Sequence, residues 1–209
     1  MTGIGQVDVH ALERALIAAR GGDEAGFEAL WVAFQPAVLR YLRVVVGDAA
    51  EDVASETWLQ AARDLSAFDG DLDRFRVWLF RIARHRGIDD RRRLRRRLED
   101  PYDPAEPDCG PPGPDSAAVA LDGLGTRWAL TVIRSLPRDQ AEAVMLRVVA
   151  GLDVAQTAQV LGKRAGAVRV AAMRGLRRLA NHPEVVARVV GRPAAERRGP
   201  VDSAQPEGV

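Results

Sequence analysis

Four carboxylates lie close together between Gly47 and Arg63, and clustered carboxylates can bind divalent metals or exchange protons in enzymes. They recur at spacings of three and four residues, which places them on one helix face together with Ser55; they are Asp48, Glu51, Asp52 and Glu56. No histidine or glycine-rich loop adjoins them. A solvated helix face is one interpretation, but Leu59 projects into the middle of this face, which favours a protein-binding surface with a polar rim.

A second chemically active group is the run from Arg91 to Arg97, six arginines in seven residues of a chain with formal net charge +1. It is either a solvated helix end or basic linker, or a contact for nucleic-acid phosphates. An apolar stripe at helical spacing precedes it: Phe75, Trp78, Leu79 and Ile82. Opposite that stripe gather Arg81, Arg84, Arg91, Arg92 and Arg95. The basic run therefore continues the polar face of a buried helix, which we expect to bend or fray beyond Arg92.

A third group lies between Leu136 and Ala180, where the pattern predicts a helix-turn-helix. Asp153 and Gln156 have the spacing of a capping box, and Gly162 supplies a turn before a longer basic helix. The side chains expected to meet phosphates and base edges are Lys163, Arg164, Arg169, Val170, Met173, Arg174, Arg177 and Arg178. A helical hairpin with a merely basic surface is the alternative.

The elements that position these groups are all expected to be α-helical. A stripe from Phe27 to Val45 predicts one buried helix face, with Asp23 as its N-cap and Pro36 expected to kink or split the helix. Trp58 and Trp78 also fall on apolar stripes and are expected in the core.

Half of the twelve prolines fall between Pro101 and Pro114, in an acidic segment that can form neither helix nor sheet. We therefore expect two small helical domains joined by an extended acidic, Pro-rich linker. The expected order is a first domain at 9–98, the linker at 99–116, a second domain at 117–182 and a disordered tail at 183–209.

Composition excludes several classes of protein. No apolar run approaches the roughly 20 residues of a membrane helix, and the start has no signal-peptide pattern. Cys109 is the single cysteine and the three histidines are scattered, so we expect no disulfide, metal or cofactor. These features predict a soluble cytoplasmic protein without membrane insertion.

The chain resembles a bacterial extracytoplasmic-function (ECF) sigma factor of the sigma-70 family over about Val9 to Ala180. Three segments carry the resemblance in the family's order: GDAAEDVASETWLQAAR, FRVWLFRIARHRGIDDRRR and LPRDQAEAVMLRVVAGLDVAQTAQVLGKRAGAVRVAAMRGLRRL. They resemble, in turn, the core-polymerase-binding helix, the segment that melts promoters and recognises the minus-ten element, and the helix-turn-helix that binds the minus-thirty-five element. Ser55, His85 and Ala171 depart from the residues common in relatives, and the last two leave the promoter sequence open.

The resemblance implies partners and roles. Residues 9–98 would be sigma region 2 and residues 117–182 sigma region 4, in a non-enzymatic alternative sigma factor of the bacterial cytoplasm that is nucleoid-associated when bound to polymerase. The acidic face from Asp48 to Leu59 would dock on the clamp helices of the polymerase largest subunit. Further partners would be the flap of the second-largest subunit, promoter DNA and an anti-sigma factor. The residues expected at the melted minus-ten strand are Ser66, Phe68, Asp69, Arg74, Arg81, Arg84, His85, Arg91 and Arg92. His85 is equally compatible with a partly buried structural role.

Two other functions stay open from the sequence. One is a helix-turn-helix regulator that binds duplex DNA without polymerase, and the other is an enzyme that holds a metal on the carboxylate cluster.

The arginine run generates a first test. We expect Arg91→Ala/Arg92→Ala to abolish promoter opening in a permanganate-reactivity assay, because these residues share a face with Arg81 and Arg84. Arg96→Ala/Arg97→Ala is the matched pair and should leave opening intact. Equal losses from both pairs would indicate a general electrostatic patch instead.

Overall fold

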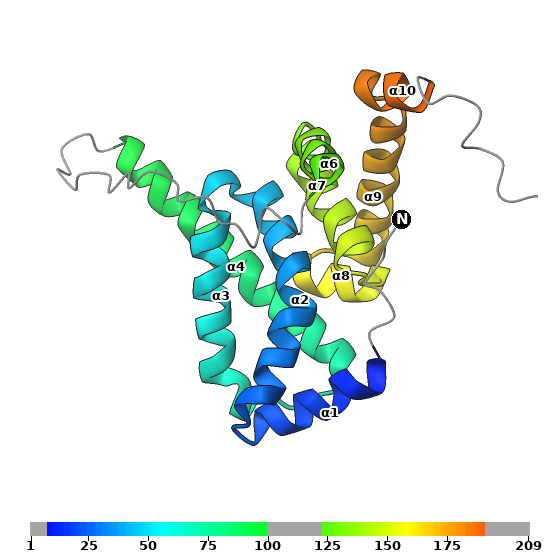
Figure 1. Cartoon of the computed structure of the whole chain (residues 1–209). Coiled ribbons are helices and arrows are strands. Elements are labelled where there is room, and N and C mark those ends of the chain that lie inside the picture. The colour runs from blue at the N-terminus through cyan, green and yellow to red at the C-terminus, as the bar shows by residue number, and fades with distance from the viewer. Residues whose placement is uncertain (1–7, 100–122, 191–209) are drawn as a thin grey trace, which may run out of the picture.

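The structure is a computed structural model that describes residues 8–99 and 123–190, and all regular elements in these stretches are helices (Figure 1). The predicted all-helical class is therefore confirmed. Apart from Glu99, the predicted linker at 99–116 lies outside the described residues. The expectations for Cys109 and for the end of the tail also lie outside them.

The first stretch forms a bundle in which α1 crosses one end of the other helices (Figure 1). Its elements are α1 (Val9–Arg20), α2 (Glu24–Val45), the 3-10 turn η1 (Gly47–Ala49), α3 (Ala50–Asp64), the 3-10 turn η2 (Leu65–Ala67) and α4 (Leu72–Glu99). The predicted N-cap of α2 is present, since the Asp23 carboxylate accepts a hydrogen bond from the Gly26 amide at 2.7 Å. The stripe of α2 is mostly buried as its spacing predicts, but Phe27 is only half-buried and Trp31 is 43% exposed.

The second stretch folds around the helix-turn-helix. Its elements are α6 (Leu124–Arg134), α7 (Arg138–Val144) with a π-helical continuation η3 (Met145–Val149), α8 (Val154–Leu161), α9 (Ala165–Ala180) and α10 (Pro183–Val190). The Asp153–Gln156 capping box is formed in both directions, each hydrogen bond being 2.8 Å. Gly162 adopts φ 64°, a left-handed conformation that suits glycine, and ends α8.

Two helices continue through positions where a split or fraying was expected, so that part of each expectation is wrong. Pro36 does not split α2, which runs through it. Proline has no N–H to donate to the carbonyl of Val32, four residues earlier. Val32 is exposed, so this side of the helix faces solvent. The helix of the arginine run does not stop at Arg92, because α4 continues to Glu99. Arg93 extends towards α3 and pairs with Glu56 at 3.3 Å, which supports the helix at the point where it was expected to fray.

The expectation of a disordered tail is also wrong for its first eight residues, which form α10. Proline suits the first turn of a helix, and α10 begins at Pro183. Two side-chain contacts hold α10 to α6. The Trp128 indole donates to Glu184 at 2.8 Å, and the Arg188 guanidinium lies 4.6 Å from the centre of the Trp128 ring.

The two helical units pack against each other, which the sequence did not predict. α4 contacts α8, and α2 contacts α6, α7 and η3. One hydrophobic core runs through both units, so that Leu42 and Phe80 of the first belong to the same cluster as Met145 and Leu152 of the second.

Tyr41 of α2 lies in this shared core. Its side chain is fully buried, its ring packs edge-on against Phe80, and its hydroxyl has no hydrogen-bond partner among the described residues. Burial raises the pKa of Tyr41 well above its ordinary value, and the nearby Glu142 carboxylate of α7 raises it further.

Tyr41→Phe removes this unpartnered hydroxyl, so we expect the free energy of unfolding at pH 7 to rise by about 1 kcal/mol. Below about pH 10 the phenol is protonated in both folded and unfolded chains. At higher pH the unfolded chain loses the proton first, because the folded pKa is raised. The wild type should therefore lose stability faster than the variant, by up to about 1.4 kcal/mol per pH unit. Urea unfolding at pH 7 and at about pH 11 measures both effects, and parallel pH profiles of the two proteins would contradict this.

Candidate protein and nucleic-acid interfaces

The acidic face of α3 and η1 is exposed, as its spacing predicts. The opposite side of α3, including Val53, Ala54 and Trp58, is buried against the bundle. Trp58 is thus a core residue, and its indole donates to the Gln35 side chain at 2.6 Å. On the outer side the exposed residues are Asp48, Glu51, Asp52, Ser55 and Leu59, whereas Glu56 is half-buried beside Arg93.

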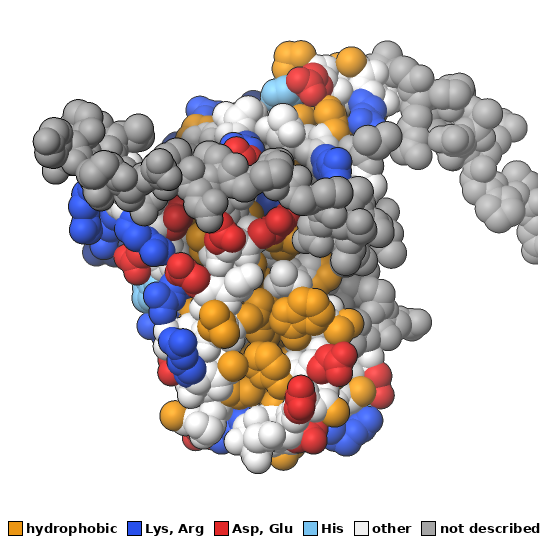
Figure 2. All heavy atoms as spheres, turned by 60° about the vertical axis from the view of Figure 1, so that its left-hand side comes forward, with side chains coloured by type: hydrophobic (Ala, Val, Ile, Leu, Met, Phe, Trp, Pro, Cys, Tyr) orange, Lys and Arg blue, Asp and Glu red, His pale blue; other side chains and the backbone are white. Residues whose placement is uncertain are grey.

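Hydrophobic side chains gather beside this acidic face. Figure 2 shows them as a continuous orange area on the side of the bundle formed by α2 and α3. The large apolar residues exposed on these two helices are Trp31, Val32 and Leu59, the last at 58%. An apolar area with acids at its border is suited to binding another protein. Within residues 8–99 and 123–190, no three His, Cys, Asp or Glu side chains form a group that could hold a metal ion.

The residues expected at the minus-ten strand do not all lie on one open face. Arg74, Arg81, His85 and Arg92 are exposed on α4, and Ser66 and Asp69 are exposed in the loop before it. Asp69 accepts from Arg20 of α1 at 3.4 Å.

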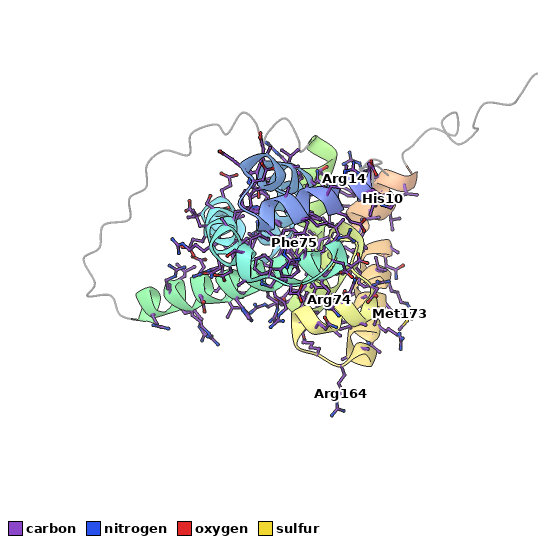
Figure 3. All side chains as sticks on the ribbon, turned by 90° about the horizontal axis from the view of Figure 1, so that it is seen from below. His10, Arg14, Arg74, Phe75, Arg164 and Met173 are labelled. Atoms are coloured by element: carbon purple, nitrogen blue, oxygen red, sulfur yellow. The ribbon has the colours of Figure 1, made fainter. Side chains whose placement is uncertain are left out.

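Phe68 is placed differently from its expectation. Its ring is 9% exposed and packs against Phe75 and Trp78, with ring centres 5.9 and 5.0 Å away. Figure 3 shows Phe75 in the interior of the bundle. Phe68 therefore supports the loop from within the core, and the structure does not present its ring to a DNA base.

Arg84 and Arg91 are the other two that depart from the expected open face. Both are half-buried and line a cavity of about 360 Å³ between α4 and α7. The Arg84 Nε donates to the Glu142 carboxylate of α7 at 3.0 Å. Glu142 is 3% exposed and was missed by sequence reasoning. The sequence does carry an indication of its burial, because Glu142 is the single acid within the apolar run Ala141–Leu146.

The basic face of α9 projects away from the molecule. Figure 3 shows Arg164 pointing outward at the start of α9 and Met173 on its outer side. The other predicted contacts exposed along this helix are Arg169, Val170, Arg174, Arg177 and Arg178. Lys163 differs from them, because its ammonium pairs with Asp139 of α7 at 2.6 Å. A basic helix that presents both cations and apolar side chains can enter a major groove.

Two family models match this chain. Residues 30–97 match the family model "Sigma-70 region 2", and residues 126–179 match "Sigma-70, region 4". The ECF RNA polymerase sigma factor SigD of Mycobacterium tuberculosis is 34% identical over 186 residues, which cover 84% of each chain. The chain belongs to the sigma-70 family. The family models lie within the two predicted domains, whose boundaries stay predictions.

Other members of the sigma-70 family show the same likeness. The ECF RNA polymerase sigma factor BldN of Streptomyces coelicolor is 36% identical over 168 residues, which cover 78% of this chain but 62% of BldN. Among solved structures, RpoE of Bartonella quintana in complex with the anti-sigma factor NepR has a TM-score of 0.58 at 22% identity, covering 79% of this chain and 98% of that one. CnrH in complex with the cytosolic domain of CnrY has a TM-score of 0.56 at 23% identity, with 82% and 96% covered. These two structures show a shared fold.

In the part of the chain that the structure describes, no helix is both long and apolar enough to cross a membrane.

The close packing of α9 on α7 can be tested at Gly175. A Cβ there would lie 2.8 Å from Val144 Cγ2 and 3.3 Å from the Gln140 carbonyl oxygen. We expect Gly175→Ala to lower the free energy of unfolding by about 1–3 kcal/mol through overpacking, although alanine favours helix. Gly166→Ala is the matched control in the same helix, because a Cβ at Gly166 meets nothing within 4 Å. It should stabilise the protein by about 0.5–1 kcal/mol. Urea unfolding compares the two, and stabilisation by both substitutions would contradict the packing argument.

Proposed function

We propose that this chain is an alternative sigma factor that binds core RNA polymerase and directs it to specific promoters. The observation that carries the proposal is the presence, in order, of sigma regions 2 and 4, each with an exposed surface of the required chemistry. On region 2 this surface is the acidic and apolar face of α3, and on region 4 it is the basic face of α9.

Each surface has its own task. The face from Asp48 to Leu59 docks on the clamp helices of the polymerase largest subunit, where apolar burial around Leu59 supplies affinity and the acids supply specificity. Region 4 also contacts the flap of the second-largest subunit. On duplex DNA, α9 enters the major groove of the minus-thirty-five element, where Arg164 and Arg169 hold phosphates.

Opening of the minus-ten element follows from the chemistry of α4. Unpairing and unstacking bases costs a few kcal/mol per base, which binding of the separated strand must offset. Arg81, Arg84, Arg91 and Arg92 provide cations for its phosphates, and His85 lies exposed on the same helix. Bond-making chemistry stays with polymerase, so the chain itself needs no catalytic group.

Regulation and location follow the family. The solved structures of RpoE and CnrH are both complexes, and the partner of RpoE is the anti-sigma factor NepR. We propose an anti-sigma partner for this chain as well, and a bacterial cytoplasmic location with the nucleoid as its site when it is bound to polymerase. A helix-turn-helix regulator acting alone is less well supported, because it gives no role to the α3 face or to region 2.

Reconstitution with purified core polymerase tests the proposal. We expect discrete run-off transcripts from a promoter library only when this chain is present. Asp52→Arg should weaken association with core at least about tenfold and abolish these transcripts, because it reverses charge in the centre of the docking face. Glu13→Arg is the matched control, since it makes the same change at an acid of α1 that is 47% exposed, and it should leave both unchanged. Absence of stable binding to core by the wild-type chain would overturn the proposal.

A further inference from the structure

A buried carboxylate joins the two helical units. Glu142 of α7 has a side chain 4% exposed and accepts from two guanidinium groups, one from each unit. The Nε of Arg84 in α4 lies 3.0 Å from one oxygen, and the Nε of Arg138 in α7 lies 2.5 Å from the other. Both oxygens are therefore bonded, which is the condition under which a buried carboxylate is tolerated.

Breaking this arrangement is unfavourable for both units at once. If the units separate, the Glu142–Arg84 bond is lost and the apolar contacts of α4 with α8 and of α2 with α6 are exposed, while hydration of the two freed charges offsets part of this cost. Further contacts cross the same boundary. The Arg134 guanidinium approaches Gly47 so closely that a Cβ built on this glycine would lie 3.1 Å from it. The Arg76 guanidinium approaches Gly151 in the same way, 3.7 Å from where a Cβ would lie.

The same contact covers part of a surface that the proposed function assigns to DNA. Arg84, Arg91 and Arg92 line the cavity between α4 and α7, together with Asp139 and Glu142. A carboxylate bonded to Arg84 occupies a position where a DNA phosphate oxygen would otherwise bind. By contrast, Asp52 and Leu59 on α3 and Arg164 on α9 stay exposed.

Dimensions also require the two units to separate on a promoter. The two elements lie about 25 base pairs apart by their names, or about 85 Å of duplex at 3.4 Å per pair. The 28 residues of α4 span only about 42 Å and the 16 residues of α9 about 24 Å, and both lengths are far below the separation of the two elements. Because α8 contacts both α4 and α9, this closed arrangement cannot reach both elements together.

We propose that Glu142 is an intramolecular latch, a residue that holds the two helical units of the free chain packed together and competes with the promoter strand for Arg84. We call this packed arrangement the closed chain. The inference rests on the proposed function and adds a form of regulation to it. Core polymerase can dock on the exposed α3 face of the closed chain, whereas single-stranded DNA gains full access to α4 only after the latch opens. The apparent affinity for DNA is then reduced by the fraction of chains that are closed.

Variants of Glu142 in the full chain, without polymerase, test the latch. We expect Glu142→Gln to enlarge the radius of gyration measured by small-angle X-ray scattering. It should also bind a fluorescein-labelled single-stranded 20-nucleotide DNA of mixed sequence at least about tenfold more tightly at fixed salt. Glu28→Gln is the matched control, because it removes the same charge from an exposed acid of α2. It should leave the radius unchanged and tighten DNA binding less than threefold.

Glu142→Asp separates geometry from charge, because it shortens the side chain by one methylene group and keeps the net charge. We expect an intermediate gain in DNA affinity and partial expansion. If Glu142→Gln lowers the helical circular-dichroism signal through local unfolding, the radius of gyration and DNA affinity of Glu142→Asp test the latch instead. Equal behaviour of Glu142→Gln and Glu28→Gln, or wild-type behaviour of Glu142→Asp in a folded chain, would overturn the latch. Because no polymerase is present, these results are independent of whether the chain supports transcription.

Discussion

The buried carboxylate of Glu142 restricts how regions 2 and 4 can pack against each other. Apolar contact between α4 and α8 is non-directional and would allow several relative placements of the two units. A carboxylate that must keep both Arg84 and Arg138 within hydrogen-bond distance allows few. Its effect extends to Tyr41, whose pKa it raises in addition to the effect of burial. The relative position of the units thus depends on a charge that neither unit could bury alone.

Local features of the fold were predictable from sequence because they depend on nearby residues. The Asp23 cap, the Asp153–Gln156 capping box and the left-handed Gly162 all follow from side chains within a few positions. The exposed acidic face of α3 followed from helical periodicity for the same reason. The end of α4 was predicted wrongly, because the pairing of Arg93 with Glu56 joins helices that are distant in sequence.

Contacts between distant segments explain the remaining differences. Phe68 follows a short 3-10 turn and carries no periodic signal, so its place in the aromatic core was not predictable. The contacts that hold α10 involve Trp128, more than fifty positions earlier. Glu142 was missed because a lone acid in an apolar run indicates a buried partner without identifying it. For the candidate site, sequence therefore predicted which surfaces exist and did not predict which of them the closed chain covers.

A sigma factor must bind polymerase and must also bind promoter DNA, and in this chain different surfaces are proposed to serve the two tasks. The α3 face and the outer side of α9 are exposed in the free chain and are proposed to meet polymerase and duplex DNA directly. Arg84 and Arg91 of α4 are proposed to become fully available only when regions 2 and 4 move apart. Promoter opening would then depend on prior docking, and a free chain would not occupy melted DNA elsewhere.

The most direct measurement is the distance between the two units in the free chain and in the initiation complex. Fluorophores on cysteines at Arg63 of α3 and Ala187 of α10, both exposed, would report it by single-molecule energy transfer, with Cys109 replaced by serine. We expect one short-distance population in the free chain and a long-distance population with core polymerase and promoter DNA. A free chain that already samples long distances, or a complex that keeps the short one, would contradict it.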